Sequence, residues 1–207
     1  MSTGATPVLR NLSLEGERVL LRPVCAEDAE AAFPLIHEQR EILDWLVWQG
    51  PDDVSELEEV YSRWITTSES GNNYHLALVE RATGMFVGTL GLRFLEHPWI
   101  GDVGYWVARE AWGKGLATEA NFLAAHLAFR HLATGVLTAE VFVGNDASAR
   151  VLEKIGYERE PAVRTQPIVG HPTRVDRDEW VFTLTRARFE RAHDGWRPVS
   201  ERVELED

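Results

Sequence analysis

The sequence predicts a single mixed α/β or α+β domain over residues 1–207, and two patterns carry that prediction. Residues 74–95 contain two apolar runs joined by a short turn at 81–84, which is typical of an antiparallel hairpin. Residues 99–144 contain a strand, a glycine turn, a long helical pattern and a second strand. That order predicts a right-handed crossover between parallel strands, so both kinds of pairing are expected in one chain.

One strand and two helices are expected before the hairpin. Residues 17–24 are β-branched and apolar between charged and proline positions, which predicts the first strand. Residues 25–43 predict a helix that is broken or kinked at Pro34. Residues 52–68 follow Pro51 and predict a second helix. Its apolar positions recur at helical spacing: Leu57, Val60, Tyr61 and Trp64.

The crossover and the C-terminal part supply the remaining elements. Strands are expected at 99–108, 136–144, 157–160 and 179–185, and helices at 116–132, 146–156 and 186–196. Gly156 is expected to cap the helix 146–156. Residues 161–178 are expected to form a loop, and the chain is expected to finish in an acidic tail.

Composition excludes several classes of protein. The formal charge is −12, with 33 acidic and 21 basic residues, which disfavours nucleic-acid partners and favours cationic ones such as amines. No apolar run reaches the roughly 20 residues needed to cross a bilayer, and no secretory signal pattern is present. The single cysteine, Cys25, permits no internal disulfide. A cytoplasmic protein without membrane partners is therefore expected.

The turn "WGKGLATE" at 112–119 is the most informative short stretch, and three interpretations compete for it. A P-loop fails because Lys114 lies between the two glycines instead of after them. A dinucleotide fingerprint fails because Thr118 occupies the position of the third glycine. An acyl-CoA turn remains, beside the simpler alternative that Gly113 and Gly115 only allow tight packing.

A longer comparison favours the acyl-CoA interpretation. The segments "DVGYWVAREAWGKGLATEA" and "TAEVFVGNDASARVLEKIGY", about twenty residues apart, resemble the GNAT acetyltransferase superfamily. The chain is most similar to the Rim-type branch, which acetylates N-terminal amines of ribosomal proteins, and the resemblance covers about residues 15–190. It implies a central, mostly antiparallel, splayed mixed sheet flanked by helices. It also implies an acetyl-CoA-dependent N-acetyltransferase whose acceptor is a protein N-terminus or a small amine.

The resemblance also implies which residues hold acetyl-CoA. Amides at the start of the helix wrap the pyrophosphate, because a helix N-terminus offers free N–H groups and a partial positive charge. Unpaired backbone groups of the preceding strand meet the pantetheine arm and the thioester carbonyl, and Asn145 contacts the pantetheine beside its role as a helix cap. The expected cofactor-binding residues are Tyr105, Trp106, Val107, Gly113, Lys114, Gly115, Leu116, Ala117, Thr118, Asn145 and Ser148.

Catalysis by direct attack of the amine, without a covalent enzyme intermediate, is implied in the same way. Many relatives carry an acidic tyrosine where this chain has Leu152, but Rim-type relatives lack it too. The resemblance to them implies that Ser148 is the proton donor to the leaving thiolate. Asp102 is the first choice for the general base, with His75 and Glu96 as rivals. The missing tyrosine and the uncertain base leave a non-catalytic acyl-CoA-binding module as the alternative.

Other candidate residues receive mostly structural interpretations. Trp45 and Trp48 lie in a region that relatives use as a substrate wall, so they are the expected specificity residues, with core packing as the alternative. Glu119, at the start of a helix, is expected to be structural. His126 and His131 are expected to be packing or surface residues, and no His/Asp/Glu cluster has metal-ligand spacing, so no metal is expected. Relatives often form homodimers, but the sequence does not set the oligomeric state.

Overall fold

A computed structural model describes residues 8–69, 71, 73–94, 98–167 and 176–206, and a nine-stranded sheet runs through these ranges. The strands are β1 (Val8–Glu15), β2 (Val19–Pro23), β3 (Asn73–Glu80), β4 (Met85–Arg93), β5 (Ile100–Val107), β6 (Val136–Phe142), β7 (Glu158–Pro167), β8 (Asp176–Thr185) and β9 (Ser200–Glu206). The helices are α1 (Glu27–His37), η1 (Arg40–Trp45), α2 (Val54–Glu69), η2 (Arg109–Ala111), α3 (Leu116–His131), α4 (Asp146–Ile155) and α5 (Arg186–Ala192).

The strand order is β7-β8-β6-β5-β4-β3-β2-β1-β9, and every described pairing except one is antiparallel. The exception is β5 with β6, which pair in parallel over three positions, from Ile100↔Val136 to Asp102↔Thr138. Beyond Asp102 the two strands separate, while β5 continues to pair with β4 as far as Val107. The predicted mixed and splayed sheet, with its parallel crossover, is confirmed.

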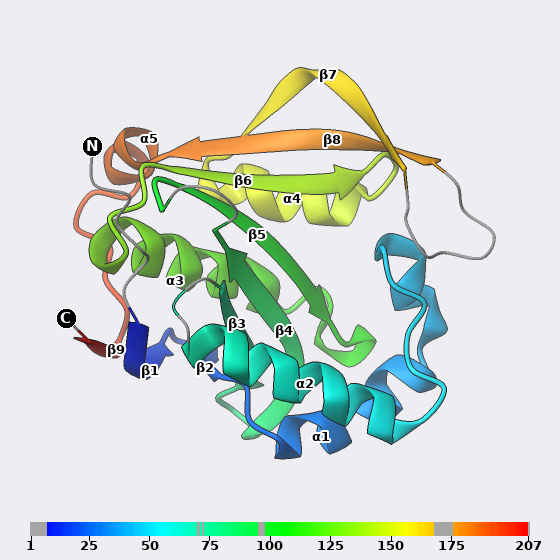
Figure 1. The fold of residues 1–207 in the computed structure, drawn as a ribbon. Coiled ribbons are helices and arrows are strands. Elements are labelled where there is room, and N and C mark those ends of the chain that lie inside the picture. The colour runs from blue at the N-terminus through cyan, green and yellow to red at the C-terminus, as the bar shows by residue number, and fades with distance from the viewer. Residues whose placement is uncertain (1–7, 70, 72, 95–97, 168–175, 207) are drawn as a thin grey trace.

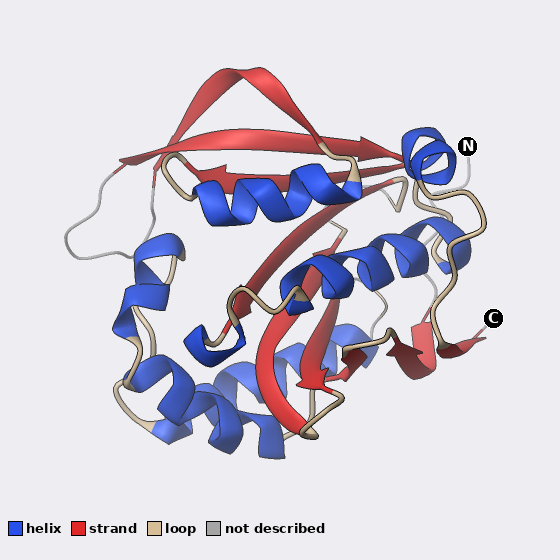
Figure 2. Ribbon diagram, turned by 180° about the vertical axis from the view of Figure 1, so that it is seen from behind, coloured by secondary structure: helices blue, strands red, loops and turns tan. Residues whose placement is uncertain are grey.

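Helices cover both faces of the sheet. In Figure 1 α1 and α2 lie in front of the sheet, and in Figure 2, seen from behind, α3 and α4 lie in front of it. The α3/α4 face holds the larger apolar core, with side chains such as Leu90, Leu123 and Phe182. The α1/α2 face holds a second core that includes Tyr61 and Trp106. Because one core lies on each face of the sheet, one side of the β5–β6 gap faces α3 and α4 and the other side faces α1 and α2.

Two predicted elements differ in their limits. The helix α1 passes through Pro34 and ends three residues later at His37, after which η1 begins, so the predicted break at Pro34 is wrong in position. Part of the predicted loop 161–178 is strand, because β7 extends to Pro167 and β8 begins at Asp176. β7 is the edge strand and contains a register shift between Arg159 and Val163, which is where proline is tolerated in a sheet.

Two strands lie outside the sequence prediction altogether. β1 precedes the first predicted strand, and β9 occupies the predicted acidic tail. The two strands pair antiparallel with each other, from Val8↔Glu206 to Glu15↔Ser200. The burial of β9 is slight, so its strand structure comes from this pairing and not from an apolar pattern of its own. Among the described residues, no helix is both long and apolar enough to cross a bilayer.

Candidate active site

The turn before α3 is built on two glycines in the left-handed conformation. Gly113 has φ +72° and Gly115 has φ +78°, values that side chains with a Cβ rarely adopt. A Cβ added at Gly113 would meet no atom within 4 Å, and one at Gly115 would meet only Nη1 of Arg18, at 3.9 Å. The described chain therefore offers no packing contact that explains the glycines. The left-handed conformation of the two glycines sets the direction of the turn, and a Cβ at either glycine would project into open space.

The first turn of α3 keeps its amides free for a ligand and its side chains occupied elsewhere. The helical hydrogen-bond ladder begins with the N–H of Glu119 donating to the carbonyl of Gly115, so the preceding amides have no helical acceptor. Leu116 is buried in the core, which fixes the helix start, and Lys114 forms an ion pair with Glu80 at 3.2 Å. A helix N-terminus with amides that have no helical acceptor is thus present at the predicted place.

Glu119 has the structural role that the sequence predicts, although its partners are remote in sequence. Its carboxylate accepts the backbone N–H groups of Glu17, Arg18 and Val19 at 2.9, 2.7 and 2.7 Å. The carboxylate therefore fastens the first turn of α3 to the β1–β2 turn.

On the α3/α4 face, a pair of hydroxyl groups joins β5 to α4 where the strands separate. The Tyr105 hydroxyl and Oγ of Ser148 lie 2.9 Å apart. Burial raises the pKa of Tyr105 to about 12, so the phenol keeps its proton at neutral pH. Asn145 caps α4 through Oδ1, which accepts the Ser148 N–H at 3.1 Å, and its Nδ2 group takes no part in that bond. The Tyr105 hydroxyl escaped the sequence analysis, which considered only the backbone of that residue.

The other two predicted strand positions point in different directions. Trp106 is buried in the α1/α2 core, where its ring lies 6.0 Å from that of Phe86. Val107 is buried on the α3/α4 face, and its carbonyl accepts the indole N–H of Trp112 at 2.8 Å. That bond fixes Trp112 at the start of the glycine turn. The roles of Trp106 and Val107 toward a cofactor stay predictions about their backbone groups.

Asp102 lies on the α1/α2 face, because Val103 and Tyr105 of the same strand pack on the other. It forms an ion pair with Arg93 of β4, which neutralises its charge in part. His75, on the same face, stacks on Trp64 with ring centroids 4.5 Å apart. Burial, with some help from Arg93, lowers the pKa of His75 to about 4, which makes it a poor proton acceptor at neutral pH. Glu96, the third predicted base, lies outside the described residues.

A further carboxylate on this face was missed by the sequence analysis. Glu179 of β8 is 5% exposed, and its Oε2 has no hydrogen-bond partner. Its neighbour Trp180 packs with the α3/α4 core, which places Glu179 on the α1/α2 side of the sheet. Burial raises the pKa of the Glu179 carboxyl above its ordinary value, and the charges of Glu140 and Asp102 raise it further, against Arg177 and Arg164. It is the titratable group of this face best suited to accept a proton.

Trp45 extends from η1 to the far side of the gap. Its ring lies 5.5 Å from the guanidinium carbon of Arg177, which in turn lies 3.9 Å from the centroid of the Phe142 ring. A Cβ on Gly144 would lie 3.9 Å from Cη2 of Trp45. Trp45 therefore forms a wall across the end of β6, whereas Trp48 packs partly buried against the α1/α2 core.

Gln39 holds that wall in place. Its amide nitrogen donates to both carboxylate oxygens of Glu110 at 2.7 and 2.8 Å, and its Oε1 accepts the N–H of Arg109 at 2.8 Å. These bonds tie the start of η1 to η2, the segment just before the glycine turn. Nothing in the sequence around position 39 signals this link, because its partners lie some 70 residues away.

Comparisons with known proteins agree with this geometry. Residues 18–158 match the profile of the family described as the acetyltransferase (GNAT) domain. Among curated proteins, the uncharacterized protein YkkB of Bacillus subtilis is 31% identical over 153 residues, which is 72% of this chain and 86% of YkkB.

Solved structures give the same result for the fold. A GCN5-related N-acetyltransferase from Brucella melitensis has a TM-score of 0.74 at 23% identity, covering 89% of this chain and 83% of that one. RimJ from Mycobacterium smegmatis, solved in complex with CoA-disulfide, has a TM-score of 0.72 at 23% identity, covering 89% and 93%. The resemblance inferred from the two sequence motifs is confirmed.

Proposed function

The chain belongs to the GNAT acetyltransferase family, whose members transfer an acyl group from acetyl-CoA, and on that premise we propose that it acetylates a primary amine by direct attack on the thioester. The observation that carries this proposal is that different chemical groups lie on the two faces of the β5–β6 gap. The helix N-terminus and a hydroxyl pair occupy one face, and a buried carboxylate with an unpaired oxygen occupies the other. A donor and an acceptor substrate can thus meet in the gap from opposite sides.

On the donor face, the residues present fit acetyl-CoA. The amides of Gly113 through Thr118 hold the pyrophosphate, with the left-handed glycines leaving room for it. The β5 backbone from Tyr105 to Val107 lines the gap beside the pantetheine and donates toward the thioester oxygen, which stabilises the oxyanion. Asn145 adds its free amide group from the start of α4.

In the chemical step, the uncharged amine forms a bond to the thioester carbon and the tetrahedral adduct loses a proton. The carbon–sulfur bond then breaks, and the thiolate takes a proton from the Ser148 hydroxyl. Tyr105, whose raised pKa keeps it protonated, donates to Ser148 Oγ and holds the serine hydrogen free for the sulfur. The proton that the adduct loses passes to solvent, and Ser148 regains one from solvent, so the uncharged amine and the thioester give an amide and a thiol with no net change in protons.

The amine arrives as an ammonium ion and must lose a proton first, and two carboxylates are placed to take it. Asp102 was the first choice from the sequence, but its ion pair with Arg93 lowers its availability. Glu179 has the unpaired oxygen and the raised pKa, both of which suit a general base near neutral pH. We therefore assign the base to Glu179 and a supporting electrostatic role to Asp102.

The acceptor class follows from the same face. A buried carboxylate and the aromatic ring of Trp45 suit a cation carried on a small or extended group, such as the α-amine of a peptide or a small amine. YdaF of Bacillus subtilis, named a putative ribosomal N-acetyltransferase and 28% identical over 152 residues, supports an amine of a ribosomal protein as the acceptor. Trp45 and Trp48 are the side chains that we expect to set the choice between these acceptors.

The test is thiol release from acetyl-CoA with a panel of peptides and small amines. Release that depends on one acceptor, with the acetyl group recovered on its nitrogen, is the expected result. Tight binding of acetyl-CoA without transfer to any acceptor would instead identify a non-catalytic acyl-CoA-binding module. Gly195→Val is the control for a substitution at Gly115, because Gly195 has a φ of +76°, close to the +78° of Gly115, and lies outside the site.

A further inference from the structure

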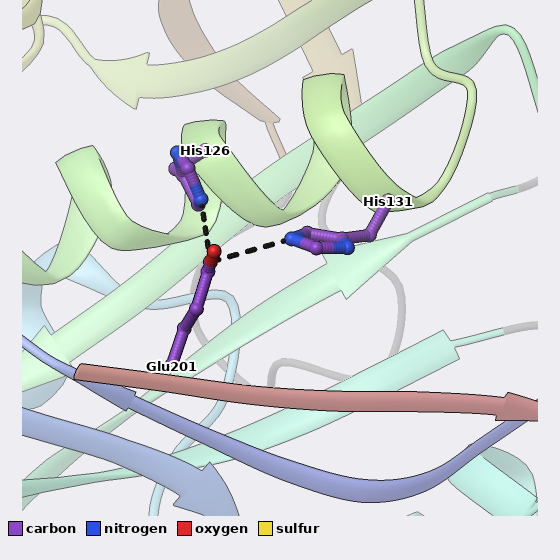
Figure 3. Close-up of side chains that lie close together, drawn as sticks. All are labelled: His126, His131 and Glu201. Atoms are coloured by element: carbon purple, nitrogen blue, oxygen red, sulfur yellow. Dashed lines mark hydrogen bonds and ion pairs between the residues drawn. The ribbon is translucent and has the colours of Figure 1, made fainter. Parts of the chain in front are cut away.

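Two histidines and a glutamate meet at the C-terminal half of α3, away from the glycine turn. His126 and His131 project from α3, and Glu201 comes from β9, where it pairs with Leu14 of β1. Figure 3 shows both imidazole rings directed at the same carboxylate oxygen. Nε2 of His126 lies 2.8 Å from Oε2 of Glu201, and Nε2 of His131 lies 3.4 Å from it. All three atoms lie within 4.8 Å of one another.

We propose that this cluster binds one divalent transition-metal ion, with Zn²⁺ as the physiological candidate. Two imidazole nitrogens and one carboxylate oxygen form a ligand set typical of zinc, whereas Mg²⁺ and Ca²⁺ select oxygen ligands. Ligands bound tetrahedrally at about 2.0–2.1 Å lie about 3.3 Å apart, so the two N···O distances change by about 0.5 Å or less, and the two nitrogens approach each other by at most about 1.5 Å. A water molecule completes the fourth position.

The surroundings of the cluster favour a metal over a simple ion pair. His126 is 3% exposed, and its ring lies 5.7 Å from the ring of Trp196. The side chains of His131 and Glu201 are 25% and 39% exposed, which leaves a path for the ion.

The place of the cluster indicates a structural role. His126 and His131 lie roughly 15 and 22 Å along the helix axis from Leu116, at a rise of 1.5 Å per residue. A metal there would clamp β9 onto α3 and stay remote from the acetyl-transfer site. The inference is thus independent of the proposed function. Sequence spacing does not show the site, because Glu201 follows His131 by 70 residues.

The experiment is a Zn²⁺ titration of the tag-free, chelator-treated full chain, in competition with a chelating dye. We expect one equivalent per chain. His131→Gln and Glu201→Gln should each weaken Zn²⁺ binding at least tenfold, because each removes one of three ligands. His37→Gln is the matched control, since His37 stacks on Phe33 in α1 and should leave the affinity unchanged.

Thermal melting supplies the second readout. Zn²⁺ should raise the melting temperature of the unmodified chain and of His37→Gln, and should leave the two ligand variants unaffected. His131→Gln changes a partly exposed side chain, so it tests the site even if Glu201→Gln fails to fold. Binding that is absent, non-stoichiometric or equal in all variants would show a hydrogen-bonded cluster only and overturn the proposal.

Discussion

The two faces of the β5–β6 gap present different kinds of chemical group, mostly backbone amides on one face and side chains on the other. On the α3/α4 face, the groups proposed to meet the donor come from two short segments, residues 105–118 and 145–148, and most of them are backbone amides. On the α1/α2 face, the candidate groups are side chains from η1, β5, β6 and β8. The rings of Trp45 and Phe142 contact Arg177, whereas Oε2 of Glu179 has no hydrogen-bond partner. The donor face therefore depends on backbone conformation, and the acceptor face depends on individual side chains.

The largest effect should come from the backbone of the donor face. Gly115→Val should remove measurable CoA binding, because a β-branched residue at φ +78° costs about 1–3 kcal/mol and its side chain fills the space over the turn. Calorimetric titration with CoA measures it. Gly195→Val imposes a similar strain at φ +76° and should bind CoA normally. Unchanged affinity in Gly115→Val would remove the pyrophosphate from this turn.

The acceptor face should respond to a single atom exchange. Glu179→Gln keeps the size of the side chain but cannot accept a proton, so kcat should fall about 100-fold or more. The dissociation constant of CoA should stay constant, since Glu179 lies on the other face. Glu160→Gln on β7 is the control, because Glu160 is partly exposed and pairs with Arg164. A larger loss in Asp102→Asn than in Glu179→Gln would return the base to Asp102.

The hydroxyl pair lies between the two cases, because it consists of side chains on the donor face. Ser148→Ala should lower kcat roughly tenfold to 100-fold through the loss of the proton donor. Tyr105→Phe should cost less, since it removes only the partner that orients the serine. Thioester donors with a better leaving thiol should reduce the loss of kcat in both variants, and steady-state kinetics with such donors checks this. Equal losses for all thiols would contradict the donor role.

The smallest effect concerns stability. The pKa of Glu179 is raised in the folded chain above its ordinary value of 4.5, so the folded state holds that proton more tightly than the unfolded state. Its contribution to stability is therefore present at low pH and lost as pH rises through the raised pKa. Glu179→Gln should gain stability relative to the unmodified chain as the pH rises above 4.5, as measured by urea unfolding. A constant difference at all pH values would contradict the shift.

The same contrast explains what the sequence could predict. Strand, glycine turn and helix are contiguous, and Gly113, Gly115 and Asn145 act through local conformation, so a short pattern contains the donor face. Glu179 lies among other charged residues in "DRDEWVF". Only the fold shows that its side chain is buried and that its Oε2 has no hydrogen-bond partner. The pairing of β9 with β1 and the link from Gln39 to Glu110 likewise join distant segments. No pattern of spacing reports such contacts.

The three paired positions between β5 and β6 have a consequence for folding cooperativity. Among the described residues, those three pairs are the strand pairing that joins the block of β6, β7, β8 and α4 to the rest of the sheet. The Tyr105–Ser148 bond, the Trp45–Arg177 contact and the packing of α3 on α4 add to it. Such a narrow connection favours partial opening of one block while the other stays folded. Acetyl-CoA would act as a missing strand between them. Hydrogen exchange in β6 and α4 should therefore slow on CoA binding more than exchange in β3, which pairs with β4 along its length and with β2 from Leu76 to Glu80.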